Sequence, residues 1–512
     1  MENQRHFLTI GLIVISAILY FKWIEFSAEK AQPAATQVVT DTSLPAVPTV
    51  VPTAQDDPGA VPSVSEGDVA PAIPELKNAV DTASLIKVET DMVVAYINPL
   101  GGVIERLELR EEPVALDKPE EGYPLLKKSA AEVFVTQDGL ISNQGAPSHQ
   151  TQYQTYQTEY SLGEQDEVRV PLSYVDDSGV EFVKTFRFKR DSYVVDINYD
   201  VQNKSATEWQ GYQYAQFSRS IPEDTGGGFG QLPSYTGAAI YTEAEKYEKI
   251  DFDELDDLQQ TQVNGKTGLQ VETDNGWVGM LQHYFVGAWI PNDGLKKFYS
   301  SKGVTAPIQY RVGFMDTAAT RVLPGETGKL STRVYLGSKE QARLKQLEKD
   351  GVEGLALSVD YGMLTPIANP LFTALSWLHK LVGNWGWAII LLTIVIKALF
   401  YPLSAASYRS MGKMRKLQPR LQTLKERYKD DRQKFQMEMM ALYKKEKVNP
   451  AGGCLPMLIQ IPVFIALYWV LLESVEMRHA PFALWWQDLS AKDPYYVLLS
   501  LIHISEPTRL DH

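Results

Sequence analysis

Two continuous apolar runs stand out in the C-terminal half of the chain, at 387–403 (WAIILLTIVIKALFYPL) and at 455–472 (LPMLIQIPVFIALYWVLL). A helix needs about 20 predominantly apolar residues to cross a hydrocarbon core roughly 30 Å thick, and runs of about 17 are within range. We therefore predict transmembrane helices over 384–403 and 451–473. A loop and the start of a further span are predicted over 474–499.

A shorter apolar run near the N-terminus predicts a membrane anchor over 1–26, with the N-terminus in the cytoplasm. A cleavable signal peptide is the alternative, because a short apolar core at this position also fits one. No small-x-small cleavage site follows directly, since Trp23, Glu25 and Phe26 come first. Residues 27–84 are rich in Ala, Val, Thr, Asp and Pro, a composition that predicts a flexible linker.

Between residues 85 and 340 apolar and polar residues alternate with a period of two. Good examples are 167–173, 181–189 and 193–201. These segments are separated by residues typical of turns. This period is typical of half-buried strands. Many short strands in succession predict one large antiparallel β-sandwich.

Residues 341–383 predict amphipathic helices at the membrane interface. Apolar residues recur there at helical spacing, over a length too short to cross a bilayer. A helix packed under the β-sandwich is the alternative. The apolar positions are Leu371, Phe372, Leu375, Leu378, Leu381 and Val382.

The charge of the chain is unevenly distributed. The net charge is −14, yet the segment 404–450 holds thirteen Lys or Arg against five acidic residues, a net +8. A short basic segment between apolar spans is typical of a cytoplasmic loop. The acidic bulk of the chain then lies on the other side of the membrane.

The basic segment also carries two apolar stripes at helical spacing, which predict an antiparallel helical hairpin with a turn at 429–431. The stripes form the hairpin's own core, and its basic outer face suits either anionic lipid headgroups or ribosomal RNA. The sequence does not rank these two partners. The stripe positions are Met411, Met414, Leu417, Leu421, Leu424 and Tyr428, then Phe435, Met439 and Leu442.

Lys397 lies within the first apolar run, about 15 Å along a helix that starts at Trp387. A cation at such a depth costs roughly 2.5 to 3.5 kcal/mol on insertion scales. Either a polar groove surrounds it, or its long side chain reaches the cytoplasmic headgroups. Thr393 on the same run, and Gln460 with two prolines on the next, favour a half-polar surface inside the membrane.

Motifs for catalysis and for cofactor binding are missing from the sequence. One cysteine, Cys454, excludes an internal disulfide and a Cys-rich metal site, and the seven histidines do not pair at metal-ligand spacing. HExxH, P-loop and GxSxG motifs are absent from the sequence. We therefore expect neither a cofactor nor an enzymatic activity.

Several segments resemble the YidC membrane-protein insertases. In the membrane part they are 384–386, 393–403, 439–444, 448–454 and 480–485, and in the large domain 245–249, 274–278 and 288–291. The second set is similar to the Gram-negative version of the family. The resemblance implies a multi-pass α-helical protein of the bacterial inner membrane, with a large periplasmic antiparallel β-sandwich of the mutarotase-like supersandwich type.

The same resemblance implies an insertase and chaperone whose intramembrane groove receives the polar tail of a nascent membrane protein. The family's charged groove residue is usually arginine, and Lys397 matches it, keeping the charge without the bidentate fork. Thr393 and Gln460 match other groove positions, and Ile461, Val463 and Phe464 match the hydrophobic slide. Arg415, Lys416, Arg420, Lys425 and Arg427 are the candidate recruitment residues of the cytoplasmic hairpin.

The partners that the resemblance implies are nascent membrane proteins, the ribosome and Sec translocon components. Anionic lipid also suits the basic hairpin, and no small-molecule substrate is expected. After residue 499 the family would continue with further spans and a basic tail, but the chain reads SLIHISEPTRLDH. We therefore expect a C-terminal truncation, with an atypical tail over 500–512.

Two other functions remain as alternatives. A membrane-anchored periplasmic carbohydrate-binding or carbohydrate-active protein would use the β-sandwich, although no catalytic constellation is visible there. A transporter would use Lys397 as an ion or substrate site, but the sequence gives no sign of the inverted repeats that many transporters have.

Overall fold

The computed structural model describes residues 49–51, 63–65, 85–222, 235–260, 268–303, 307–429, 431–446, 455–484 and 486–490. The predicted anchor at 1–26 and tail at 500–512 lie outside these residues, as does most of the predicted linker. The described part of that linker forms a small antiparallel pair of strands, β1 (Thr49–Val51) and β2 (Ser63–Ser65).

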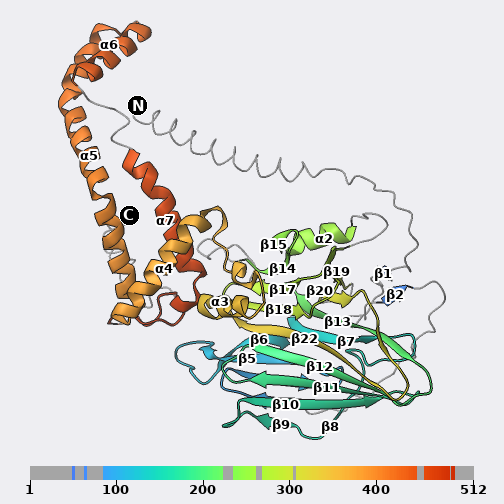
Figure 1. Cartoon of the computed structure of the whole chain (residues 1–512). Coiled ribbons are helices and arrows are strands. Elements are labelled where there is room, and N and C mark those ends of the chain that lie inside the picture. Colours follow the sequence, from blue (N-terminus) through green and yellow to red (C-terminus); the bar gives the residue numbers. More distant parts are fainter. Residues whose placement is uncertain are drawn as a thin grey trace, which may run out of the picture. The chain divides into compact units, whose positions relative to one another are not determined.

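Two large β-sheets form the described part of the chain between residues 86 and 338 (Figure 1). The first has nine strands in the order β15-β14-β17-β18-β22-β12-β11-β10-β8, and every neighbouring pair is antiparallel. Its strands are β8 (Gln154–Thr155), β10 (Glu167–Val175), β11 (Val180–Lys189), β12 (Val194–Asn203), β14 (Gly237–Thr242), β15 (Lys246–Ile250), β17 (Gly276–Gln282), β18 (Phe285–Pro291) and β22 (Thr327–Ser338).

The second sheet has eleven strands, in the order β16-β19-β20-β13-β7-β6-β5-β4-β3-β9 with β21 beside β13. Its pairs are antiparallel except for β3 and β9, which run parallel. Its strands are β3 (Ile86–Glu89), β4 (Val93–Asn98), β5 (Val103–Pro113), β6 (Gly122–Lys128), β7 (Val133–Ile141), β9 (Glu159–Ser161), β13 (Trp209–Ser220), β16 (Gln270–Thr273), β19 (Lys296–Lys302), β20 (Gln309–Asp316) and β21 (Thr320–Val322).

The antiparallel β-sandwich predicted from the period of two is confirmed. The three example segments are β10, β11 and β12, and along β11 buried and half-buried residues alternate without a break. Large aromatic side chains fill the core; Trp289 packs against Phe217, and Trp277 is fully buried. Burial of such side chains from both sheets is the main stabilising contribution to the domain.

One buried position of β11 holds a lysine instead of an apolar residue. Lys184 and Asp138 of β7 are both fully buried, and Lys184 Nζ lies 2.8 Å from Asp138 Oδ1. Nζ also donates to the Gly102 carbonyl at 2.5 Å, and the Tyr199 hydroxyl donates to Asp138 Oδ2 at 2.8 Å. Burial lowers the pKa of Lys184, while Asp138 acts in the opposite direction. The ion pair joins the two sheets through the core.

Helices make up most of the described chain after β22. Among the described residues, α5 is the one helix long and apolar enough to cross a membrane, and 458–473 of α7 form a shorter apolar helix. The multi-pass arrangement therefore stays a prediction. The helices are α2 (Phe252–Gln260), within the sandwich, and then α3 (Gln341–Lys349), η1 (Leu355–Ser358), η2 (Gly362–Leu364), α4 (Thr365–Val382), α5 (Trp385–Arg427), α6 (Arg432–Lys445), α7 (Leu455–Glu473) and η4 (Val475–Met477).

Helix α4 is amphipathic, with Phe372, Leu375 and Leu378 buried. It packs against both α5 and α7. Leu381 and Val382 of the predicted apolar stripe are instead exposed, because they fall in the last turn before Gly383 ends the helix. The buried stripe is therefore shorter than the sequence pattern predicts.

Helix α5 runs through the predicted span and the first arm of the predicted hairpin without a break (Figure 1). The span predicted from the sequence ends at residue 403, yet the segment 404–411 (SAASYRSM) contains no Gly, Asn or Asp that would stop a helix. Pro402 and Pro419 lie inside the helix.

Helices α5 and α6 pack against each other where the hairpin is predicted, with one difference in the seam. Leu417 is buried, and its partners in the stripes are half-buried. Met411 does not belong to the seam, since 40% of it is exposed. Arg420 pairs with Glu446, at the end of α6, with 2.7 Å between Nη1 and Oε1. Met411 precedes Arg420 by about 13 Å along α5 and so lies beyond the end of α6.

Polar contacts join the segment after α7 to the β-sandwich. Arg478 Nη1 lies 3.0 Å from Glu112 Oε2 of β5, and its guanidinium lies over the rings of Tyr123 and Phe285. The His479 ring nitrogen Nε2 lies 3.0 Å from the Pro113 carbonyl. The end of α7 is thereby tied to the sheet.

Glu476 of η4 lies in the same region. Its Oε1 accepts a hydrogen bond from the Gln341 backbone N–H at 3.2 Å, and its buried Oε2 has no partner among the described residues. Burial raises the pKa of Glu476 to about 7, although the Gln341 N–H acts in the opposite direction. The folded protein therefore holds a proton here that the unfolded chain releases at lower pH.

We expect Glu476→Gln to reduce the loss of stability as the pH rises from 5 to 8. A raised carboxyl pKa contributes stability that is complete below the unfolded pKa of about 4.5 and is lost as the pH rises through about 7. The full shift corresponds to about 3 kcal/mol, and the remaining exposure of Glu476 makes the effect smaller. Thermal unfolding of both purified full chains at pH 5 and pH 8 measures it. Parallel losses in the two proteins would contradict the assignment.

Candidate functional site

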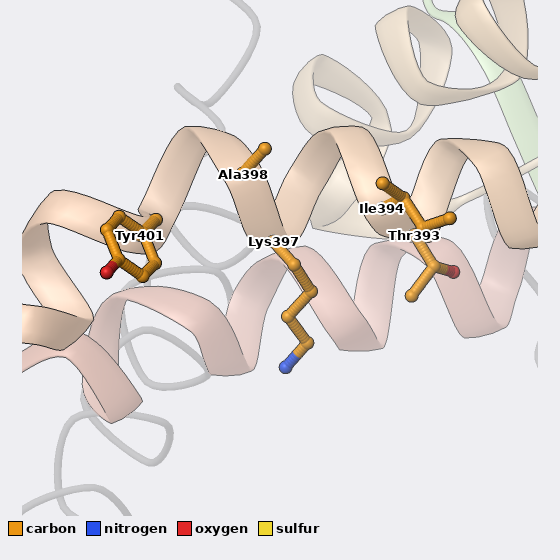
Figure 2. A pocket seen from close by; sticks show the side chains of 5 residues that line it. All are labelled: Thr393, Ile394, Lys397, Ala398 and Tyr401. Atoms are coloured by element: carbon orange, nitrogen blue, oxygen red, sulfur yellow. The ribbon is translucent and has the colours of Figure 1, made fainter.

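A cavity of about 490 Å³ lies along α5, where Thr393, Ile394, Lys397, Ala398 and Tyr401 line it (Figure 2). Figure 2 shows the side chains of Lys397 and Thr393 extending from α5 toward α7. Thr393, Lys397 and Tyr401 follow one another at intervals of four residues and so share a helix face. The cavity therefore combines one cation and two hydroxyl groups with apolar carbon.

The start of α5 fixes where these side chains lie. Asn384 is its N-cap: the side-chain oxygen accepts a hydrogen bond from the Trp387 N–H at 3.1 Å. The Asn384 amide donates to the carbonyls of Pro481 and Phe482, at 3.0 and 3.1 Å. A Cβ on Gly386 would overlap the Phe482 ring, so only glycine lets the helix approach this closely. The Asn-Trp-Gly sequence thus joins α5 to the loop that follows α7.

The Lys397 ammonium lies over an aromatic ring of the neighbouring helix. Its Nζ is 4.9 Å from the centroid of Phe464, on α7. Within the part of the chain that the structure describes, no carboxylate forms an ion pair with Lys397. A cation that is held only by a ring remains available to an incoming anion, because charge–charge attraction exceeds that between a charge and a quadrupole.

The remaining predicted groove and slide residues differ in how far their side chains are buried. The Thr393 hydroxyl donates to the Ile389 carbonyl at 2.9 Å and is half-buried. Gln460 is also half-buried, on α7, and does not line the cavity in the described part of the chain. On the same helix Ile461 and Phe464 are exposed, whereas Val463 packs against the core.

Three residues that line the cavity are not among those predicted from the sequence: Ile394, Ala398 and Tyr401. For Tyr401 a signal was present, since it lies one helical turn beyond Lys397 on the same face. Ile394 and Ala398 look like any other apolar residues of a membrane span. Only the packing of the helices identifies them.

The candidate recruitment residues lie farther along α5, away from the cavity. Arg415, the first of them, is about 27 Å from Lys397 along the helix. Arg420 pairs with Glu446, as described above. All five are exposed: Arg415, Lys416, Arg420, Lys425 and Arg427.

Solved structures of low sequence identity resemble about half of the chain. One is a galactose mutarotase related enzyme from Lactobacillus acidophilus, with 10% identity and a TM-score of 0.31 over 49% of this chain and 97% of that one. A putative aldose 1-epimerase from Escherichia coli gives 10% identity and a TM-score of 0.30, over 49% and 98% of the two chains. At this low similarity the mutarotase-like classification stays a prediction.

Two family models match the sequence. The model of the YidC periplasmic domain matches residues 85–374, and that of the 60Kd inner membrane protein matches residues 377–508. The second match includes residues 500–508, which belong to the segment predicted to be an atypical tail.

Relatives match over nearly the whole chain. The membrane protein insertase YidC of Nitrosococcus oceani is 43% identical, over 99% of this chain and 88% of its own. That of Methylobacillus flagellatus is 44% identical, over 99% and 87%. Identity of this level over this length, together with the two model matches, shows that the chain belongs to the YidC family of membrane protein insertases.

Proposed function

We propose that the protein inserts nascent membrane proteins into the inner membrane by drawing their polar ends into the cavity beside Lys397. Its relatives are membrane protein insertases, which supports insertion as the activity and disfavours an enzymatic one. The same relatives give no support to the carbohydrate-binding alternative. The family description supports a location in the inner membrane.

One observation carries the proposed mechanism. Lys397 lies within an apolar helix, beside a cavity, and its ammonium has an aromatic ring but no described carboxylate as partner. A polar client tail that enters such a groove keeps part of its hydration and meets a positive charge, which lowers its desolvation cost. The client's apolar segment then moves into lipid, which is downhill without a nucleotide.

The exposed apolar surface of α7 supports a slide for the client helix. Ile461 and Phe464 are 43% and 41% exposed, and Val463 packs behind them. A client segment that leaves the groove along this surface stays in contact with apolar side chains. In this mechanism Thr393 and Gln460 give the groove its polar surface.

We further propose the multi-pass topology that the charge distribution supports. The N-terminal anchor (1–26), the segment 384–403 that includes the start of α5, and the segment 451–473 that includes α7 span the membrane, and a linker (27–84) leads to the β-sandwich (85–340) in the periplasm. The net charge of +8 over 404–450 supports a cytoplasmic hairpin, whose basic residues recruit ribosomes, Sec translocon components or anionic lipid. The segment 341–383 lies at the periplasmic interface, and a further span begins within 474–499.

Replacing Lys397 with alanine tests the role of the charge. We expect insertion of a client with an acidic N-terminal tail to fall about tenfold, which corresponds to a loss of about 1.4 kcal/mol of attraction. Lys397→Arg should preserve insertion, because the charge remains. Protease protection of the client in proteoliposomes measures the amount inserted, with a neutral-tailed client as control. Equal losses for both clients would contradict a role of the charge.

Crosslinking tests whether clients pass through this site. A photoreactive amino acid at Lys397, Gln460 or Phe464 should capture a stalled nascent membrane protein. Leu399 is a matched control, because it lies on α5 but on nearly the opposite helix face and is 74% exposed. Capture at Leu399 alone would contradict the proposed path.

A further inference from the structure

The contact between Lys397 and Phe464 links two features that are functionally distinct in the proposed mechanism, the groove charge and the apolar slide. We propose that Phe464 is a positioning residue, whose ring holds the Lys397 ammonium within the groove until an anionic group of a client replaces the ring. This inference rests on the proposed function of Lys397 and adds a state of the groove without a client.

The positions of the two residues are set by packed helices. Leu392 and Ile396 of α5 and Ala466, Leu467 and Val470 of α7 belong to one buried apolar cluster. Both helices also pack against α4. The distance of 4.9 Å between Nζ and the ring centroid therefore results from helix packing and not from a chance approach of two loops.

Few other groups compete for the Lys397 ammonium within the cavity. The Thr393 hydroxyl donates its proton to the Ile389 carbonyl. Ile394 and Ala398 offer only carbon, which leaves the Tyr401 hydroxyl as the other polar group of the lining. The negative face of the Phe464 ring is thus the main electrostatic partner of the cation in this region.

Without the ring, the lysine has a clear alternative. Its four-carbon stem is long enough for the ammonium to reach toward the aqueous boundary, and Lys397 is exposed. Tyr401, one turn farther along α5, is 71% exposed. The ring therefore decides between a cation that faces α7 and one that reaches toward water.

A client carboxylate replaces the ring because it carries a full charge. Attraction between two opposite charges decreases more slowly with distance than attraction between a charge and a ring quadrupole. The ring holds the cation weakly enough to release it. Clients with acidic tails are accordingly the class that benefits most from Phe464.

Amine labelling of the full chain in proteoliposomes without any client tests directly whether the Phe464 ring holds the Lys397 ammonium. A water-soluble succinimidyl ester labels accessible lysines, and mass spectrometry of the peptide gives the rate at Lys397 relative to Lys413 of the same helix. We expect Phe464→Leu, which keeps an apolar side chain but removes the ring, to raise the rate about fivefold. Phe464→Tyr should keep the wild-type rate.

Ile465→Leu is the matched control, because Ile465 neighbours Phe464, is 44% exposed and has no ring to lose. It should leave the labelling rate at Lys397 unchanged. Equal labelling in wild type, Phe464→Leu and Phe464→Tyr would overturn the proposal. A rate that also rises in Ile465→Leu would overturn it too, since packing and not the ring would then hold the lysine.

Insertion assays separate this proposal from the proposed function. Phe464→Leu should lower insertion of an acidic-tailed client severalfold more than that of a neutral-tailed one, and it should have no further effect in a Lys397→Ala background. If labelling of Lys397 rises in Phe464→Leu, but neither Phe464→Leu nor Lys397→Ala affects insertion selectively, the positioning role of Phe464 is supported. The proposed role of the Lys397 charge in insertion is then wrong. If Lys397→Ala lowers insertion of the acidic-tailed client selectively and labelling of Lys397 is unchanged in Phe464→Leu, the proposed role of the Lys397 charge stands. The positioning role of Phe464 is then wrong.

Discussion

Replacing Lys184 with methionine is expected to lower the free energy of unfolding of the β-sandwich by about 3 to 5 kcal/mol. Methionine keeps most of the volume of the lysine stem, so the substitution removes the charge without opening a large cavity. The Asp138 carboxylate then remains fully buried with the Tyr199 hydroxyl as its remaining partner among the contacts described above. An isolated buried carboxylate is strongly unfavourable, and the loss follows from it.

Thermal unfolding of the purified full chain, followed by the β-sheet band of its circular dichroism, measures this effect. For a domain of this size the expected decrease in Tm is about 10 °C. The control is the double variant Asp138→Leu with Lys184→Met, which removes both charges and should recover most of the stability. If the double variant were no more stable than Lys184→Met alone, packing and not the uncompensated charge would explain the loss.

Replacing Gly386 with alanine is the second change with a large expected effect. The added Cβ would overlap the Phe482 ring. That ring cannot move aside easily, since it is stacked on Trp486 at 6.0 Å and meets the edge of Trp387 at 5.4 Å between centroids. Overpacking of this kind costs about 1 to 3 kcal/mol. Because Lys397 lies on the same helix, we also expect slower insertion of acidic-tailed clients.

Gly412→Ala is the matched control, because Gly412 lies in the same helix and has no atom within 4 Å of its added Cβ. Alanine is a better helix former than glycine by about 1 kcal/mol, so this variant should be slightly more stable than wild type. Thermal unfolding in detergent compares the two variants. A Gly386→Ala protein as stable as Gly412→Ala would show that the Phe482 loop adapts to the added carbon.

Lys397, Gly386 and Gly412 all lie in helix α5. The N-cap Asn384 and Gly386 hold the first turn of α5 against Pro481 and Phe482, and Lys397 follows about three turns later on the same helix. A site on a helix whose end is fixed keeps its geometry better than a site on a loop. This arrangement explains how a single cation can be presented reproducibly toward α7.

The sequence alone determined the features that depend on neighbouring residues. The period of two over 167–201 predicted β10, β11 and β12, because successive side chains of a strand point to opposite faces. The helical spacing predicted α4 and the hairpin seam from Met414 onward. Segments that resemble the YidC family, such as 384–386 and 448–454, were sufficient to predict the family that the relatives confirm.

The tertiary structure alone decided which distant residues meet. Lys184 falls at an inward position of β11, but its partner Asp138 is 46 residues away on the other sheet. The sequence placed Phe464 among the candidate slide residues, but only the packing of α7 against α5 placed its ring over Lys397. The local period of apolar residues predicts which face of a helix or strand is buried. It does not record which element covers that face, because many packings of the same helices and sheets satisfy one pattern.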